Sequence, residues 1–344
     1  MERVLSADEH LFAVARRGVR LSNVVVAPVV AWALLCLSRV PLLMVQWLAP
    51  DAFSRLAGCW PVTSSQAGDS GQVYGALLLD LRLWSTFIPL GGLALAWAVL
   101  AEGRPLASFV VSLRGAGRRA LVGAMLGICA VLLICGIAAV CGEVRAVPGD
   151  RGSGQSVALA VGLAGLGWAI QGTGEELLSR GWLMTSLGAR YGPWFGIAAS
   201  SLLFASFHIL NPDFGWLPGL NLALIGGLFG LVAVWQRCFW GVFALHAAWN
   251  WTLAHALGLT VSGIDVPGPS LVRLDLDGPS WLVGGAFGVE GGVATTIVAA
   301  LGILGIVWML RRRTEGRCEG SVADQVDGSG GRGSSPEGRQ GSDA

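Results

Sequence analysis

Three clusters of polar residues lie in stretches that are otherwise apolar, and their residue types suit the hydrolysis of a peptide bond. Taken alone, each has an ordinary structural explanation: a salt-bridged helix end, a satisfied buried histidine or an interhelical hydrogen bond. Charged and polar groups inside a membrane are costly, so three clusters on three segments predict one functional site. The clusters are Glu175-Glu176 with Arg180, Phe204 with His208, and His246 with Asn250.

The two adjacent glutamates are expected to face different directions. On a helix with about 100° per residue, Arg180 lies about 40° from Glu176 and about 140° from Glu175. Arg180 can therefore neutralise Glu176 as an (i, i+4) pair, which leaves Glu175 without this partner. A carboxylate in a low dielectric has a raised proton affinity, so Glu175 could take a proton from water as that water attacks a carbonyl carbon.

The histidines and the asparagine complete this hypothesis. One histidine could orient the attacking water, while the other and the Asn250 amide could donate hydrogen bonds to the developing oxyanion. The sequence has no serine nucleophile motif and no HExxH, so the serine and gluzincin routes have little support. His255 lies about 180° around the helix from His246 and is expected to face away. Arg39, Asp80 and Arg82 are interpreted as groups that pair or snorkel near an interface.

The order EExxxR, FxxxH and HxxxN resembles the CAAX protease and bacteriocin-processing (CPBP or ABI) family of intramembrane endopeptidases. The resemblance implies that Glu175 activates water with His208 as its partner, and that His246 and Asn250 line the oxyanion site. It also implies that Glu176 and Arg180 hold the site together. Glutamate and histidine suit zinc as well, but the resemblance favours a glutamate-activated water and no cofactor. The implied substrate is a membrane-associated peptide or lipidated protein, including prenylated CAAX proteins.

The elements that position these residues are predicted to be membrane-spanning helices. Hydrophobic residues make up 53% of the 344 residues and charged residues only 13%, whereas soluble domains carry about 25% charged residues. The net charge of +1 gives no electrostatic footprint for nucleic acid. A span needs about 20 apolar residues, so we expect an all-α polytopic bundle of eight helices around a polar cavity. The eight segments are Val24–Leu48, Leu77–Leu100, Ala120–Cys141, Val157–Ser179, Pro193–Ile209, Gly219–Trp235, Trp240–Leu259 and Trp281–Leu310.

Arginine is distributed unevenly between alternate loops, with 13 residues in one set and 4 in the other. This bias places both termini in the cytoplasm of a multi-pass cell-membrane protein. The use of Arg without Lys and the high Gly content suggest a GC-rich bacterial source. The expected organisation is a cytoplasmic segment (1–23), three helices (24–155), a catalytic core (156–260), an outer loop with the eighth helix (261–313) and a disordered tail (314–344).

A non-enzymatic function is the alternative to a protease. The same polar cluster could belong to an immunity or scaffold protein, or to a transporter that binds a ligand. Transporters often carry internal repeats, and the sequence shows no such symmetry. The decisive observation is whether Glu175→Gln abolishes function in a protein that still folds and inserts.

Overall fold

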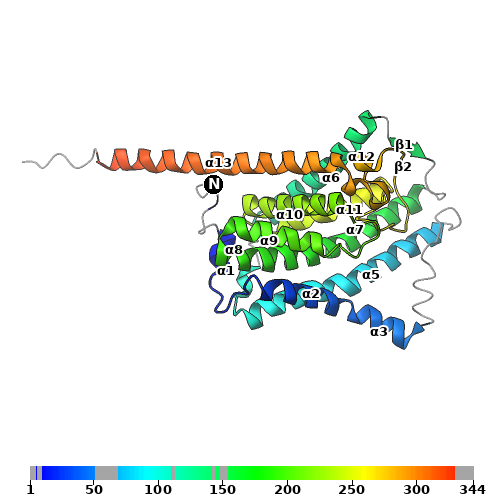
Figure 1. The fold of residues 1–344 in the computed structure, drawn as a ribbon, viewed down its shortest axis with the longest axis horizontal. Coiled ribbons are helices and arrows are strands. Elements are labelled where there is room, and N and C mark those ends of the chain that lie inside the picture. The colour runs from blue at the N-terminus through cyan, green and yellow to red at the C-terminus, as the bar shows by residue number, and fades with distance from the viewer. Residues whose placement is uncertain are drawn as a thin grey trace, which may run out of the picture.

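A computed structural model describes residue 5 and residues 10–50, 69–109, 113–141, 144–147 and 154–329, with the backbone alone for 316–329. Long helices lie side by side and account for most of these ranges, so the protein is an all-α polytopic membrane protein (Figure 1). The helices long enough to cross a membrane are apolar over most of their spans, as expected where the outer face meets lipid and the inner face meets other helices.

Six of the eight predicted segments correspond to helices that are long and apolar enough to cross a membrane. The other two are shorter, so the predicted count of eight is not confirmed by the described residues. They are α9 (Pro193–Ser206) and α11 (Trp240–Trp251), which continues into a π-helical turn, η4 (Thr252–Ala256). The six are α2 (Val26–Ser38) with α3 (Val40–Leu48); α5 (Asp69–Ala96) with η1 (Trp97–Ala101); α6 (Ala116–Val140); α7 (Gly154–Glu176) with η3 (Leu177–Met184) and α8 (Thr185–Tyr191); α10 (Trp216–Gln236); and α13 (Val293–Ser329).

The last span differs from its predicted bounds at both ends. It begins at Val293 and not at Trp281, because Gly284, Gly285 and Gly288 adopt left-handed φ angles that interrupt a helix. The preceding residues form α12 (Ser280–Val283) and the short 3-10 turns η5 (Gly285–Phe287) and η6 (Val289–Gly291). At the other end α13 continues to Ser329, so the helix runs past the expected start of a disordered tail at residue 314. Residues 330–344 of that expected tail lie outside the described residues.

Hydrogen bonds gather the arginine-rich loops at one end of the bundle. Arg16 donates to the Ala189 carbonyl, Arg190 to Leu21, and Arg313 to Trp235. The short helix α1 (His10–Ala15) packs on α8 at this end (Figure 1). At the opposite end, β1 (Val144–Val147) pairs antiparallel with β2 (Arg273–Leu276) and joins two loops of the arginine-poor set. The two sets of loops predicted from charge are therefore separated in space.

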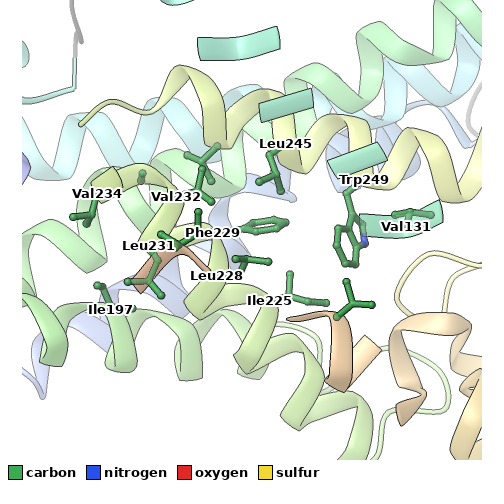
Figure 2. Close-up of a cluster of buried hydrophobic side chains, with 14 of the residues drawn as sticks. Val131, Ile197, Ile225, Leu228, Phe229, Leu231, Val232, Val234, Leu245 and Trp249 are labelled. Carbon is green, nitrogen blue, oxygen red and sulfur yellow. The ribbon is translucent and has the colours of Figure 1, made fainter. Parts of the chain in front are cut away.

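The packed interior lies between α6, α10 and α11. Phe229 and Ile225 of α10 face Leu245 and Trp249 of α11, with Val131 of α6 nearby (Figure 2). Within this interior α6 and α11 approach closely, because a β-carbon on Gly123 would overlap the Gly241 carbonyl oxygen and one on Gly127 would press on the Leu245 carbonyl. Small residues at such crossings let helix backbones meet in a membrane.

We expect Gly123→Ala to destabilise the bundle, whereas Gly136→Ala on the same helix should not. A β-carbon at Gly136 meets no atom within 4 Å, so this substitution should leave stability unchanged or raise it by up to about 1 kcal/mol through helix propensity. Overpacking at Gly123 should lower stability by about 1–3 kcal/mol. Thermal unfolding of both variants in detergent tests this, and equal melting temperatures would contradict the close α6–α11 crossing.

Candidate active site

A buried ion cluster joins α7, η3 and α11 at the centre of the bundle. Arg180 Nη1 donates to Glu176 Oε1 at 2.8 Å, and His246 Nδ1 lies 2.9 Å from the same oxygen. Arg180 Nη2 also donates to the Gly226 carbonyl of α10 at 2.8 Å. Glu176 and Arg180 are completely buried. The (i, i+4) pair predicted from the sequence is therefore present and is bridged to a second helix by His246.

Two phenylalanines enclose this cluster. The Arg180 guanidinium carbon lies 4.7 Å from the ring centre of Phe204 and 5.6 Å from that of Phe229. The His246 ring contacts the same two rings, at 5.9 and 5.3 Å between centres. Cation–π contacts of this kind favour the cationic form of Arg180 where water is excluded. The FxxxH and HxxxN motifs thus meet around the EExxxR motif.

Glu175 points away from the buried pair and into a cavity. Its side chain is 17% exposed, and its Oε1 accepts a 2.7 Å hydrogen bond from Gln171 Nε2, one turn earlier on α7. Its Oε2 lies 3.8 Å from His246 Nε2. One imidazole therefore stands between the two glutamates, with Nδ1 toward Glu176 and Nε2 toward Glu175. This separation of the glutamates agrees with the helical-wheel prediction.

Gln171 connects Glu175 to Asn250. Its Nε2 donates to Glu175 and its Oε1 accepts from Asn250 Nδ2 at 3.0 Å. The amide orientations of both residues are set by this chain, because a carboxylate can only accept. Sequence reasoning missed Gln171. Its position four residues before Glu175 places it on the same helical face, and this spacing could have identified it.

His208 lines the same cavity from the end of α9. Its Nδ1 lies 2.9 Å from the Phe204 carbonyl oxygen. Because a carbonyl cannot donate, Nδ1 must carry the proton, and the neutral ring presents Nε2 as an acceptor. The structure records no contact between His208 and Glu175; what the two side chains share is the cavity.

The cavity has a volume of about 510 Å³ and lies between α2–α3, α5, α7, α9 and α11. Its walls are mostly apolar, with Leu35, Leu83 and Phe207 among them. A mainly apolar cavity with a few converging polar groups is the usual form of a small-molecule or peptide site. The first helices of the chain therefore contribute part of the cavity wall, although the predicted core of residues 156–260 contributes more. The polar and charged residues that line it are Arg39, Arg82, Thr86, Gln171, Glu175, Ser179, His208, Asn211, His246, Asn250, Ser262 and Glu290.

Glu290 is a second buried carboxylate that sequence reasoning missed. Its Oε1 accepts from Trp249 Nε1 at 3.0 Å, and its Oε2 accepts from the Ser262 amide at 2.6 Å and hydroxyl at 2.9 Å. Glu290 thereby ties the loop after η4 to α11, directly beside Asn250. Its signal was present in the sequence as a lone acid between glycines, inside a segment that was predicted to be one continuous helix.

The helix that carries the glutamates is longer than predicted. It continues from Gly154 to Tyr191, so Glu175 lies well inside the span. Immediately after Glu176 the helix widens into the π-helical η3. π-Helical turns are rare and occur frequently at functional sites. Glu102, outside this helix, accepts hydrogen bonds from Trp182 and Ser186 and so anchors η3 and α8.

The other two histidines lie apart from this cluster. His255 is buried in η4, where its Nδ1 lies 3.0 Å from the Pro269 carbonyl, and it does not line the cavity. His10 is exposed at the start of α1. Within the described ranges, no three or more His, Cys, Asp or Glu side chains are arranged to hold a metal ion.

Arg180→Met should destabilise the protein strongly, because Glu176 would then be a buried charge without its arginine. Removal of one partner of a buried ion pair costs about 3–5 kcal/mol. The double substitution Glu176→Gln/Arg180→Met should recover part of this loss, and Arg118→Met at an exposed position should have no effect. Melting temperatures in detergent measure all three. An Arg180→Met protein as stable as Arg118→Met would contradict the buried pair.

Glu290→Gln should also lower stability. The substitution replaces one accepting carboxylate oxygen by an NH2 group, which would then face a hydrogen-bond donor of Trp249 or Ser262. The expected loss is about 1.5–3 kcal/mol for a hydrogen-bonded charged group. The exposed Glu315→Gln removes the same charge from the surface and is the matched control. Equal melting temperatures for the two variants would show that Glu290 does not hold the loop.

Comparison with known proteins agrees with this geometry. Residues 157–252 match the family model described as Rce1-like, type II CAAX prenyl endopeptidase Rce1-like. The matched range contains all three motifs, from Glu175 to Asn250, and confirms the resemblance to the CPBP family. It supports a membrane-embedded endopeptidase of the CAAX type. No solved structure matches the chain.

Proposed function

Since residues 157–252 carry an Rce1-like CAAX endopeptidase domain, we propose that this protein hydrolyses a peptide bond near the C-terminus of a prenylated, CAAX-like substrate. The observation that carries the proposal is that the two adjacent glutamates have different partners. Glu176 is bonded to Arg180 and His246, whereas Glu175 lies in an apolar-walled cavity, where Gln171 is its one hydrogen-bond donor among the described residues.

In the first step Glu175 takes a proton from a water molecule, and the water oxygen attacks the carbonyl carbon of the scissile bond. Glu175 is suited to this role because its side chain reaches the cavity and is not paired with an arginine. His208 orients the same water: its Nδ1 is held by the Phe204 carbonyl, so its Nε2 can accept a hydrogen bond from that water.

The attack places a negative charge on the carbonyl oxygen. Asn250 has one amide hydrogen engaged with Gln171, and its second hydrogen is available to the oxyanion. His246 lies on the same face of α11 as Asn250. Its Nε2, which is directed toward Glu175, is the second candidate donor to the oxyanion. Glu175 then returns the proton to the leaving amine as the C–N bond breaks. The products are a new carboxylate on the prenylated fragment and a released peptide.

The cavity suits a lipidated peptide. Leucine and phenylalanine side chains from α2, α3 and α5 form much of its wall, and α7 and α11 bring Gln171, Glu175, His246 and Asn250 to it. A prenylated cysteine at the C-terminal box brings such a substrate to the membrane. We place both termini in the cytoplasm, supported by the arginine-rich loops that gather at the end where α1 and α8 pack.

Glu175→Gln should abolish cleavage of a farnesylated CAAX peptide by the purified protein. Loss of a general base lowers the rate by about 10²–10⁴-fold, while the amide side chain keeps the shape of the site. The readout is kcat/KM by mass spectrometry, with melting temperature as the control for folding and Glu315→Gln as the charge-matched control. Chelator is added in a parallel series.

Three results would contradict this proposal in different ways. Undiminished cleavage by Glu175→Gln would remove Glu175 as the base. Loss of wild-type activity on chelation would show that a metal takes part. Failure of the folded wild-type protein to cleave any prenylated peptide would exclude this substrate class and favour a non-enzymatic use of the polar cluster.

A further inference from the structure

An arginine interrupts the first span on the side that faces the cavity. Arg39 lies between α2 and α3 and lines the cavity together with Leu35 and Leu43, which share its helical face. Pro41 follows in the first turn of α3 and removes a backbone hydrogen-bond donor, so the helix breaks at this point. The sequence interpretation of Arg39 as a snorkelling residue near an interface does not describe this position.

The Arg39 guanidinium has no recorded hydrogen bond or ion pair to any described residue, and the residue is exposed. Its place in the Val26–Leu48 span is far from both ends. Thirteen residues separate it from Val26 and nine from Leu48, which correspond to about 20 Å and about 14 Å of helix. Such distances are long for snorkelling to a lipid headgroup. An ionisable residue at this depth marks a functional site and requires a partner.

The cavity itself is the place where that partner would bind. Arg39 and Glu175 line the same space, with Arg39 on the α2–α3 wall and Glu175 on the α7 wall. The residues that line the cavity on α7 run from Trp168 to Ser179, about 16 Å along the helix axis. Three extended residues span about 10 Å. A cavity of about 510 Å³ that both side chains line therefore has room for a short extended peptide.

We propose that Arg39 binds the C-terminal carboxylate of the substrate, and that this contact selects substrates cleaved close to a free C-terminus. The inference rests on the proposed function, since a CAAX box ends in a carboxylate. A guanidinium can hold a carboxylate with two parallel hydrogen bonds, which is a strong and directional contact. Taking a carboxylate into an apolar-walled cavity without such a partner would be costly.

The contact would also act against internal cleavage of membrane proteins. An internal segment has no carboxylate at the required position, so Arg39 would stay unpaired when such a segment occupies the cavity. Specificity then has two sources. The substrate carboxylate pairs favourably with Arg39, and an internal segment is disfavoured because it leaves the Arg39 charge unpaired.

The test compares two farnesylated CAAX peptides that differ only in a C-terminal carboxylate or carboxamide. Wild type should prefer the acid by about 10–100-fold in kcat/KM, as expected for a hydrogen-bonded charge pair. Arg39→Gln should bring this ratio close to one, and Arg39→Lys should leave an intermediate ratio. Arg82→Gln is the matched control, because Arg82 is an exposed arginine on the same cavity, and it should keep the wild-type ratio.

A binding measurement separates this inference from the proposed reaction. In the Glu175→Gln background, fluorescent versions of both peptides are titrated, with and without Arg39→Gln. An Arg39-dependent preference for the acid supports the carboxylate site even if wild type cleaves neither peptide, and in that case the proposed reaction alone fails. Equal binding of acid and amide overturns the carboxylate site whatever the cleavage result.

Two further outcomes would overturn the inference. One is a ratio lost in Arg82→Gln but kept in Arg39→Gln, which would assign the carboxylate to the other arginine. The other is an unchanged ratio in Arg39→Gln together with loss of thermal stabilisation by phosphatidylglycerol, which would show that Arg39 holds a lipid phosphate.

Discussion

The structure depends on a charge that is buried at the centre of a membrane protein and must be compensated there. Glu176 is fully buried, and its compensation comes from Arg180 on its own helix and from His246 on α11. Because Arg180 also bonds the backbone of α10, one ion cluster fixes three helices relative to each other. Interactions of this type add little net stability compared with apolar packing, but an arrangement of the helices that separated the partners would leave a buried charge uncompensated.

Close helix contacts make this compensation geometrically available. Gly172 brings α7 against the backbone of Ala247, and Gly174 brings it against Phe87 of α5. A larger residue at either position would push the glutamates away from His246 or close the cavity from the α5 side. The polar contacts of the site therefore depend on the close approach of the helix backbones. Close packing of this kind is common in membranes, where apolar burial between helices gives little driving force.

Much of this arrangement can be predicted from the sequence, for identifiable reasons. The orientation of Glu175 and Glu176 follows from helix periodicity, and the six long spans follow from apolar length. Gln171 was predictable by the same periodicity. Glu290 stands out in the sequence as an isolated acid, but its partners Trp249 and Ser262 could not be predicted, nor could the walls formed by α2 and α5, because they depend on tertiary contacts between segments distant in the chain. The glycines before Val293 indicated that the helix is interrupted there. Hydropathy averaged over a window of residues does not reveal this interruption.

The short helix α9 places a turn of irregular backbone beside the cavity. Its 14 residues extend about 21 Å, less than the roughly 30 Å of a hydrocarbon core, and the chain then turns back into α10. This turn meets the loop after η4, where Asn211 donates to the Ser262 carbonyl. Irregular backbone at such depth persists only where protein buries it or an aqueous space solvates it. Asn211 and Pro212 of this turn line the cavity together with His208 and Ser262, so the turn that shortens α9 also forms one wall of the site.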